Sequence, residues 1–540
     1  MQTSAGKSQF ILWALLGLAA LFFCFFGLNR IDFTNLDEGY YASVSFEMAS
    51  GGDWVTPRLN GKPWWEKPPM LYWTEANAFR LFGYKEWAGR LPSALAVLLT
   101  LIITVYFATR WFNLRVGLYS GATLLTALYF LVQSHLATTD GLLMFFLTLS
   151  FCSLWEFMRG VGKWWLLISA IACGLAVLTK GPVALVFLVV LAVILYWRTP
   201  DLRAQHKPSS LVLWGLGAAA LFLIVVLPWY IAVIRQHGPG FTSEFLIRQN
   251  LGRFSGGDAA HNLPFWGMAL YFFAGFFPWS LYIIPAAIQE RGTNNERFLW
   301  SWFLLVFVVF SISSAKLPSY LLPLYPAAAI LIGRLWAYDT FRSTKSVRRI
   351  SITLFSLFTL ITAAFFCPKL ITDAHLERQI LESEIPKILW LLRIAFAFGA
   401  VMLGLSLFAS QRLRKWNLSQ IGLLGFVAIL WTTALIFAPA YNERTWRPVH
   451  SMVEQVRPEM SKGAKLVLFN LHPAYPSAQF YARHAFEASD KPDEISRLAS
   501  TTSSLYIIAK TKDLEKLGNI SYTKCSTIED WTLIKSVEGK

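Results

Sequence analysis

The chain has 540 residues, of which 55% are hydrophobic and 15% are charged, and its formal net charge is +16. It contains repeated apolar runs of about 20 residues, the length that crosses a bilayer as a helix, which excludes a soluble globular protein. Nucleic-acid binding is disfavoured, because it needs basic residues gathered on one soluble face and here they recur between the apolar runs.

The first apolar run, residues 10–29, follows a short N-terminus that carries Lys7 and has no small-residue cleavage site. We therefore expect an uncleaved membrane helix rather than a secretory signal. Twelve further runs lie at residues 88–109, 116–135, 141–158, 164–179, 181–197, 211–234, 264–288, 298–314, 318–337, 350–367, 388–409 and 418–440. The sequence thus predicts a polytopic α-helical membrane protein with about thirteen spans. If Lys180-Gly181-Pro182 forms a tight hairpin, the count is odd and the termini lie on opposite sides.

Basic residues indicate the orientation, because Lys and Arg concentrate in short cytoplasmic loops. With the N-terminus inside, the inner loops carry Arg110 and Arg115, Arg159 and Lys163, Arg198, Arg203 and Lys207, Arg342, Lys345, Arg348 and Arg349, and Arg412, Arg414 and Lys415. The outer side then holds a long loop at 30–87, a second at 235–263 and everything after Ala440. We expect a membrane domain over 1–440 and an extracytoplasmic C-terminal domain over 441–540.

The first outer loop opens with an expected helix. From Asp37 to Met48, apolar and aromatic residues recur at three- and four-residue spacing, the pattern of an amphipathic helix lying at an interface, and Gly51-Gly52 would end it. Asp37 and Glu38 fall in its first turn, where carboxylates suit the helix dipole. Capping is the structural alternative to catalysis for both residues, and for Glu38 it is the preferred interpretation.

The stretch "NGKPWWEKPPMLYW", residues 60–73, places Glu66 beside Lys67 between a Trp pair and a Pro pair. Pro63, Pro68 and Pro69 disfavour helix in the residues before them, so we expect the two charges on an extended, rigid segment beside the membrane. The alternative is that the segment only anchors the protein at the headgroups through its Trp residues.

The tail after Tyr441 is richer in charge and contains short apolar runs at 465–470 and 504–509 that predict strands of a small α/β domain. It has no Gly-rich phosphate loop and no metal-ligand spacing. We expect no chemistry there.

Several motifs in order along the chain carry a family resemblance: "DEGYY", "GDWVTPRLNG", "WWEKPPMLYW", "TTDGLLMFF", "LTKGP", "RFSGGDAAHNLPFW" and "SSAKLPSYLLPLYP". The membrane part resembles the aminoarabinose transferases of lipid A and the related protein O-mannosyltransferases, integral-membrane glycosyltransferases of the GT-C class. The resemblance implies a bacterial inner-membrane enzyme that moves a sugar from undecaprenyl phosphate, or another polyprenyl phosphate, to an acceptor on the periplasmic face.

The resemblance also implies site residues. By position, Asp37 matches an acidic residue needed for activity, and Asp140 matches an Asp at the outer end of the fourth helix. The resemblance therefore implies Asp37 and Asp140 as catalytic residues. Lys67 matches the lysine that holds the lipid phosphate, and Arg253 and Tyr320 match further residues around it.

Lipid phosphates need fixed cations at membrane depth, and Lys180 and Lys316 lie on other outer turns. There they would stabilise the charge that grows as the sugar–phosphate bond breaks. Headgroup anchoring or snorkelling is the alternative for these lysines.

Glu66 and His261 offer a carboxylate and an imidazole, which commonly bind a divalent ion such as Zn²⁺, Mg²⁺ or Mn²⁺, and the resemblance associates this pair with metal. Two ligands make a weak site, and His261 as an ordinary loop histidine is the alternative.

The sequence is compatible with two kinds of acceptor for the sugar, a phosphate and a hydroxyl. A lipid A phosphate would already be ionised, so Asp37 would orient it, whereas a hydroxyl acceptor would need Asp37 as general base. Protein O-glycosylation at Ser or Thr is the second enzymatic function. A lipid-linked sugar transporter or a noncatalytic scaffold is the non-enzymatic one, but transporters place ionisable groups near the bilayer midplane, whereas these charges lie at helix ends.

Overall fold

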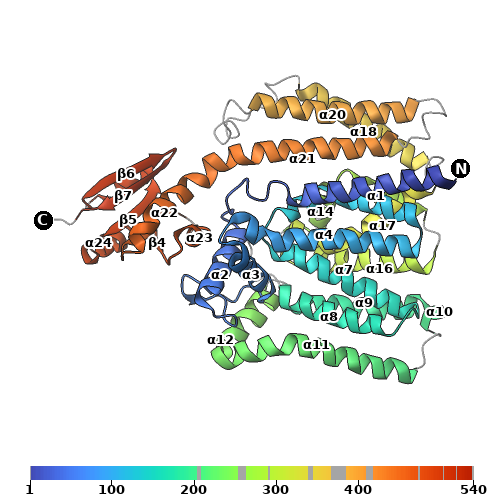
Figure 1. The fold of residues 1–540 in the computed structure, drawn as a ribbon, viewed down its shortest axis with the longest axis horizontal. Coiled ribbons are helices and arrows are strands. Elements are labelled where there is room, and N and C mark those ends of the chain that lie inside the picture. Colours follow the sequence, from blue (N-terminus) through green and yellow to red (C-terminus); the bar gives the residue numbers. More distant parts are fainter. Residues whose placement is uncertain are drawn as a thin grey trace.

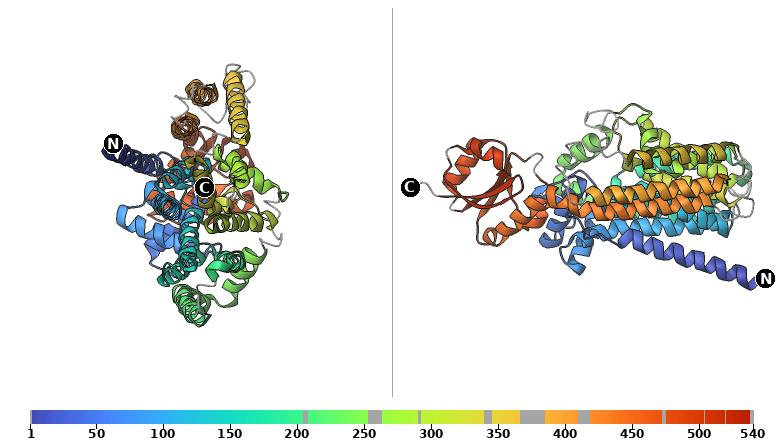
Figure 2. Two further views of the ribbon diagram at one scale, coloured as in Figure 1. Left: turned by 90° about the vertical axis from the view of Figure 1, so that its right-hand side faces the viewer. Right: turned by 90° about the horizontal axis from the view of Figure 1, so that it is seen from above.

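The structure, a computed structural model, describes residues 2–203, 208–252, 263–289, 292–338, 345–365, 385–408, 418–471, 475–502, 504–518 and 520–537. Long helices run side by side in one bundle, and the N-terminus lies at the end opposite the C-terminal sheet (Figure 1). The view from above shows the same separation (Figure 2). The two termini therefore lie at opposite ends of the molecule.

The bundle begins with α1, and its helices fall on the predicted apolar runs, although the runs at 116–135 and 264–288 are each broken by a sharp bend. Their bounds are α1 Gln2–Phe25, α4 Glu86–Trp111, α5 Leu114–Leu125, α6 Leu128–Ser134, α7 Thr139–Met158, α8 Trp164–Lys180, α9 Val183–Arg198, α10 Pro200–Arg203, α11 Pro208–His237, α14 Gly267–Gly275, η3 Trp279–Tyr282, α15 Ile283–Ile288, α16 Asn294–Ile312, η4 Pro318–Leu324, α17 Tyr325–Ala337, α18 Lys345–Phe365, α20 Ile385–Phe408 and α21 Leu418–Thr445.

Among the described residues, seven helices are long and apolar enough to cross a membrane, and up to nine spans result if each of two bent helix pairs is one span. The bent pairs are α5 with α6, at 70°, and α14 with the η3–α15 segment, at 111°. Shorter apolar helices include α8 and α9. The protein is therefore a polytopic helical membrane protein.

The turn between α8 and α9 is tight. Helix α8 ends at Lys180 and α9 begins at Val183. Gly181 between them has a φ of 92°, which a residue with a side chain rarely adopts. The Lys-Gly-Pro sequence thus forms a hairpin and leaves Lys180 at its tip.

Helix α2, Asp37–Gly51, begins and ends where the sequence predicts, and Gly52 closes it in the left-handed conformation with a φ of 74°. The prediction that it lies amphipathically at an interface is wrong. It is buried on most sides, because it packs between α3 (Met70–Phe82) and α23 (Ala478–Ala482). The Ser45 hydroxyl accordingly donates to Glu75 of α3 at 2.7 Å.

The stretch from Asn60 to Trp73 packs against two other segments. It begins at the turn of the small hairpin formed by β1 (Arg58–Leu59) and β2 (Lys62–Pro63). The Trp64 ring stacks on Tyr40 of α2, with centroids 5.0 Å apart, and the Trp65 ring lies 4.7 Å from that of His237 at the end of α11. These Trp residues therefore join α2 to α11, and the Pro-rich segment between them and α3 is held in place.

The second loop of the same end begins with α12 (Pro239–Phe241) and η1 (Thr242–Gly252). The tail then begins where α21 ends, at Thr445, beyond Ala440. Its elements are α22 Arg447–Met460, β3 Lys465–Phe469, α23 Ala478–Ala482, β4 Glu487–Ser489, α24 Pro492–Thr501, β5 Leu505–Lys510, η8 Thr511–Leu517, β6 Tyr522–Ile528 and β7 Trp531–Ser536.

The tail strands form one sheet in the order β4-β3-β5-β7-β6. Strand β3 is parallel to β4 and β5, whereas β7 is antiparallel to β5 and β6. Strands β3 and β5 coincide with the two apolar runs that predict strands. The sheet lies at the end of the bundle that also holds α2 and α3 (Figure 1).

Candidate functional site

Asp37 is the first residue of α2, and its side chain is exposed. Protein atoms nevertheless surround the carboxyl group closely. Desolvation raises the pKa of Asp37 above its ordinary value, and the positive charge of Lys67 offsets part of that rise. Asp37 is thus an accessible carboxylate whose ionised form the fold does not favour, and groups with perturbed pKa values gather at functional sites.

Lys67 lies on the Pro-rich segment before α3 and is buried. Its ammonium donates to Oε1 of Glu66 at 2.9 Å. The side chains of Lys67 and Glu66 are only 10% and 15% exposed, so this pair is shielded from bulk water. A shielded ammonium held by a stiff segment is suited to a fixed anion.

Asp140 and Lys180 form a second pair. Asp140 lies in the first turn of α7, Lys180 is the last residue of α8, and their Oδ1 and Nζ atoms are 2.5 Å apart. The Lys180 ammonium also lies 4.4 Å from the ring centroid of Tyr320, in η4. Three predicted site residues from three separate elements therefore meet at one point.

The two pairs converge on Asp37. The charges of Lys67, Glu66, Asp140 and Lys180 all act on its carboxyl group. The arrangement brings one accessible carboxylate together with two ammonium groups, each held by its own carboxylate. Chemically, it can bind an anionic group and orient or deprotonate a nucleophile beside it.

Glu38, next to Asp37, has a structural role, but through an ion pair rather than through the capping that the sequence favoured. It is 1% exposed and accepts from Arg90 at 2.7 Å and 3.0 Å. The backbone N–H groups of Thr34 and Ala137 donate to the same carboxylate, each at 3.0 Å. Glu38 thus fixes the start of α2 to α4 and to the segment before α7.

Arg90 is the residue that sequence reasoning missed. It is fully buried in α4, and beyond Glu38 it donates to the carbonyl groups of Leu28, Ile31 and Asp32 at 2.7 Å, 2.7 Å and 3.0 Å. An arginine near the start of an apolar helix is a signal for a buried partner. The pair that it forms with Glu38 holds the chain on both sides of Asp37.

The other predicted site residues are placed differently. Lys316 is buried, and its ammonium donates to the carbonyl of Ser313, the C-cap residue of α16, at 2.6 Å. It therefore stabilises a helix end. Arg253 and His261 lie outside the described residues.

The described residues do not by themselves fit a metal site. They include no group of three or more His, Cys, Asp or Glu side chains that could hold a metal ion. Glu66 supplies one carboxylate, and Lys67 already binds its Oε1. Among these described residues, the groups that can carry charge or transfer a proton are the carboxylates of Asp37, Glu66 and Asp140 and the ammonium groups of Lys67 and Lys180.

Comparisons with known proteins show which family the chain resembles. Residues 11–241 match the family model described as dolichyl-phosphate-mannose-protein mannosyltransferase. The undecaprenyl phosphate-alpha-4-amino-4-deoxy-L-arabinose arabinosyl transferase of Edwardsiella ictaluri is 31% identical over 415 residues, which cover 74% of this chain and 72% of the relative. The transferase of the same name from an Enterobacter species is 30% identical over 344 residues, 61% of this chain and 59% of the relative.

Solved structures share the fold. ArnT from Cupriavidus metallidurans, bound to undecaprenyl phosphate, has a TM-score of 0.78 at 22% identity and covers 97% of this chain and 98% of its own. The archaeal oligosaccharyltransferase AglB from Archaeoglobus fulgidus has a TM-score of 0.52 at 12% identity, over 99% of this chain and 75% of its own.

The similarity to these transferases and the shared fold make the chain an integral-membrane glycosyltransferase of the GT-C class. Within that class, the chain belongs to the family of undecaprenyl phosphate-alpha-4-amino-4-deoxy-L-arabinose arabinosyl transferases.

Proposed function

We propose that this protein transfers 4-amino-4-deoxy-L-arabinose from undecaprenyl phosphate to lipid A on the periplasmic face of the bacterial inner membrane. The observation that carries the proposal is the convergence of the Lys67–Glu66 and Lys180–Asp140 pairs on the accessible Asp37. The names of the curated relatives supply the sugar and the donor.

The donor phosphate would bind at Lys67, with Lys180 and Tyr320 on the other side and Arg253 from the second loop. As the acceptor oxygen forms its bond to the anomeric carbon, the bond from that carbon to the phosphate oxygen breaks. The electron pair stays on the phosphate, whose growing charge the lysines stabilise. A single carboxylate at the reacting carbon fits direct displacement with inversion.

Asp37 would act on the acceptor. A phosphate of lipid A is already ionised, so Asp37 would orient the acceptor or the sugar. Asp140 would hold Lys180 in place for the donor. Lys316 would contribute positive charge to the same region from the end of α16.

Mass spectrometry of lipid A from cells with and without this protein tests the proposal. Lipid A should gain one aminoarabinose with the wild-type protein and none with Asp37→Asn. Unmodified lipid A in cells that express the folded wild-type protein would contradict it.

Protein O-glycosylation is the second candidate, favoured by the mannosyltransferase family match over residues 11–241. The envelope proteins of the same cells should then carry a new sugar on Ser or Thr, while lipid A stays unchanged.

We also propose thirteen spans, with the N-terminus cytoplasmic, a membrane domain over 1–440 and a periplasmic domain over 441–540. The separation of the termini supports this topology (Figure 2). Alkaline phosphatase fused after Thr445 should be active, and the same enzyme fused after Arg198 should be inactive. The reverse pattern would overturn the orientation.

A divalent ion at Glu66 and His261 is a separate proposal. If it is needed, EDTA should abolish transfer by the purified protein, and added Zn²⁺ or Mg²⁺ should restore it. Full activity in EDTA would exclude the ion.

A further inference from the structure

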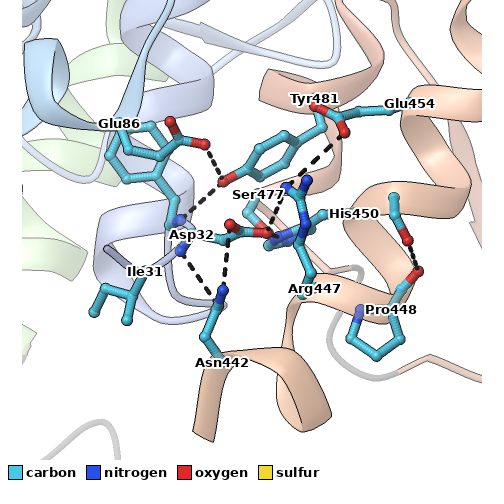
Figure 3. Close-up of polar contacts among 12 residues, drawn as sticks. Ile31, Asp32, Glu86, Asn442, Arg447, Pro448, His450, Glu454, Ser477 and Tyr481 are labelled. Carbon is cyan, nitrogen blue, oxygen red and sulfur yellow. Dashed lines mark hydrogen bonds and ion pairs between the residues drawn. The ribbon is translucent and has the colours of Figure 1, made fainter. Parts of the chain in front are cut away.

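A buried polar network joins the C-terminal segment to the loop that carries Asp37 (Figure 3). Asp32 lies five residues before Asp37 and is 7% exposed. Its Oδ2 atom lies 2.9 Å from Nδ1 of His450, in α22, and its backbone N–H donates to Oδ1 of Asn442 at 3.2 Å. Two residues of the C-terminal segment therefore hold one residue of the first loop.

His450 is fully buried at the centre of this network. Because an ionised Asp32 only accepts hydrogen bonds, Nδ1 of His450 carries the proton. Its Nε2 atom lies 2.7 Å from the Ser477 hydroxyl, and its ring stacks on Tyr481 with centroids 4.0 Å apart. Tyr481 in turn accepts from the backbone N–H of Phe33 at 2.9 Å.

Ser477 also lies against α2, at Gly39. A Cβ atom built on Gly39 would lie 2.9 Å from the backbone nitrogen of Ser477 and 2.5 Å from the carbonyl oxygen of Thr34. Only a glycine allows this approach. Ser477 thus packs on α2 two residues after Asp37.

The contacts that run from Ser477 through His450 to Asp32 resemble those of a Ser-His-Asp hydrolase triad, but this is not a hydrolytic site. Ser477 is fully buried, so no substrate reaches its hydroxyl. The side chain of Asn35 also hydrogen bonds to Ser477. The three residues instead connect the loop, α22 and the start of α23.

We propose that His450 is a positioning residue for sugar transfer. It acts through Asp32 and Ser477, which hold the chain on both sides of Asp37, and so it sets where the Asp37 carboxylate lies relative to Lys67. The inference rests on the proposed function. It assigns a role in the reaction to the C-terminal domain, although that domain holds none of the reacting groups.

His450→Phe is the main test, because it keeps a ring over Tyr481 and removes both hydrogen bonds. We expect kcat with the undecaprenyl phosphate-linked donor to fall by roughly 10- to 100-fold, the scale of a misplaced catalytic group, with KM for the donor little changed. His450→Asn should restore part of kcat, because its amide can donate to Asp32. His484→Phe is the matched control and should have wild-type kcat. His484 lies in the same domain, and its Nε2 atom contacts the Ser461 hydroxyl.

Two further measurements separate positioning from stability. Asp32→Asn should lower kcat as His450→Phe does, and the double variant should be no worse than either single one. Hydrogen exchange in a peptide over residues 31–39 should be faster in His450→Phe than in the wild type.

Wild-type kcat in folded His450→Phe or Asp32→Asn would overturn the inference, as would unchanged exchange over 31–39. If His450→Phe is not recovered folded, Asp32→Asn decides. If the wild-type protein transfers no sugar, the proposed function fails instead, and the exchange experiment alone decides whether His450 positions the loop.

Discussion

The ammonium of Lys180 lies 2.5 Å from the carboxylate of Asp140, joining the end of α8 to the start of α7. Both side chains are largely shielded, at 14% and 10% exposure. Asp140 is therefore a charge partner of a lysine rather than a free carboxylate. In the proposed function, the pair would serve the reaction through Lys180.

Lys180→Met should destabilise the protein, because it leaves the Asp140 charge shielded and unpaired, at a cost of about 3–5 kcal/mol. The double variant Lys180→Met/Asp140→Asn should recover much of the thermal stability. Sugar transfer should stay low in the double variant if Lys180 contacts the donor. Recovery of transfer along with stability would instead show that the pair is only structural.

Asp37→Asn should lower transfer by roughly 100-fold or more, the scale of acid–base groups. The variant should be at least as stable as the wild type at pH 7. The pKa of Asp37 is raised in the folded state above its unfolded value. The ionised carboxylate is therefore less favourable in the folded protein, and stability falls as the pH rises from the unfolded pKa to the folded pKa. Near-normal turnover with a lower melting temperature would support a capping role instead.

Lys67→Ala should weaken binding of undecaprenyl phosphate by the purified protein in nanodiscs and reduce transfer. Lys67→Arg should restore binding only in part, because a planar fork replaces a point charge. Lys62→Ala, an exposed lysine in β2 of the same loop, is the matched control. Equal affinity for undecaprenyl phosphate in Lys67→Ala and Lys62→Ala would show that the segment with Glu66 and Lys67 only anchors the protein at the headgroups.

The stability that His450 provides should depend on pH. Burial lowers the pKa of His450 and outweighs the hydrogen bond and charge of Asp32, which raise it. Because the folded pKa lies below the unfolded value of about 6.5, stability is complete above that pH and is lost as the pH falls. The melting temperature of the wild type should therefore fall toward that of His450→Phe as the pH is lowered from neutral through this window. A constant difference over this range would contradict the expectation.

Local sequence predicted most of the helices and named several charged residues that the structure brings together, and longer-range contacts explain what it missed. The apolar runs predicted α8 and α9 and left a tight hairpin between them as one possibility, and the structure shows that hairpin at Gly181. The burial of α2 could not be read from its own periodicity, since α23 and the segment before it cover α2 from more than 400 positions away. Arg90 and Glu38 are 52 residues apart, so no spacing pattern joins them.

Asp32 and His450 are separated by 418 residues. Ribosomes add about 5–20 residues per second, so His450 is made roughly 20–80 s after Asp32. The loop that carries Asp37 cannot make its contacts with His450 until α22 has been synthesised. We therefore expect a nascent chain to remain inactive until almost all of its length has been produced.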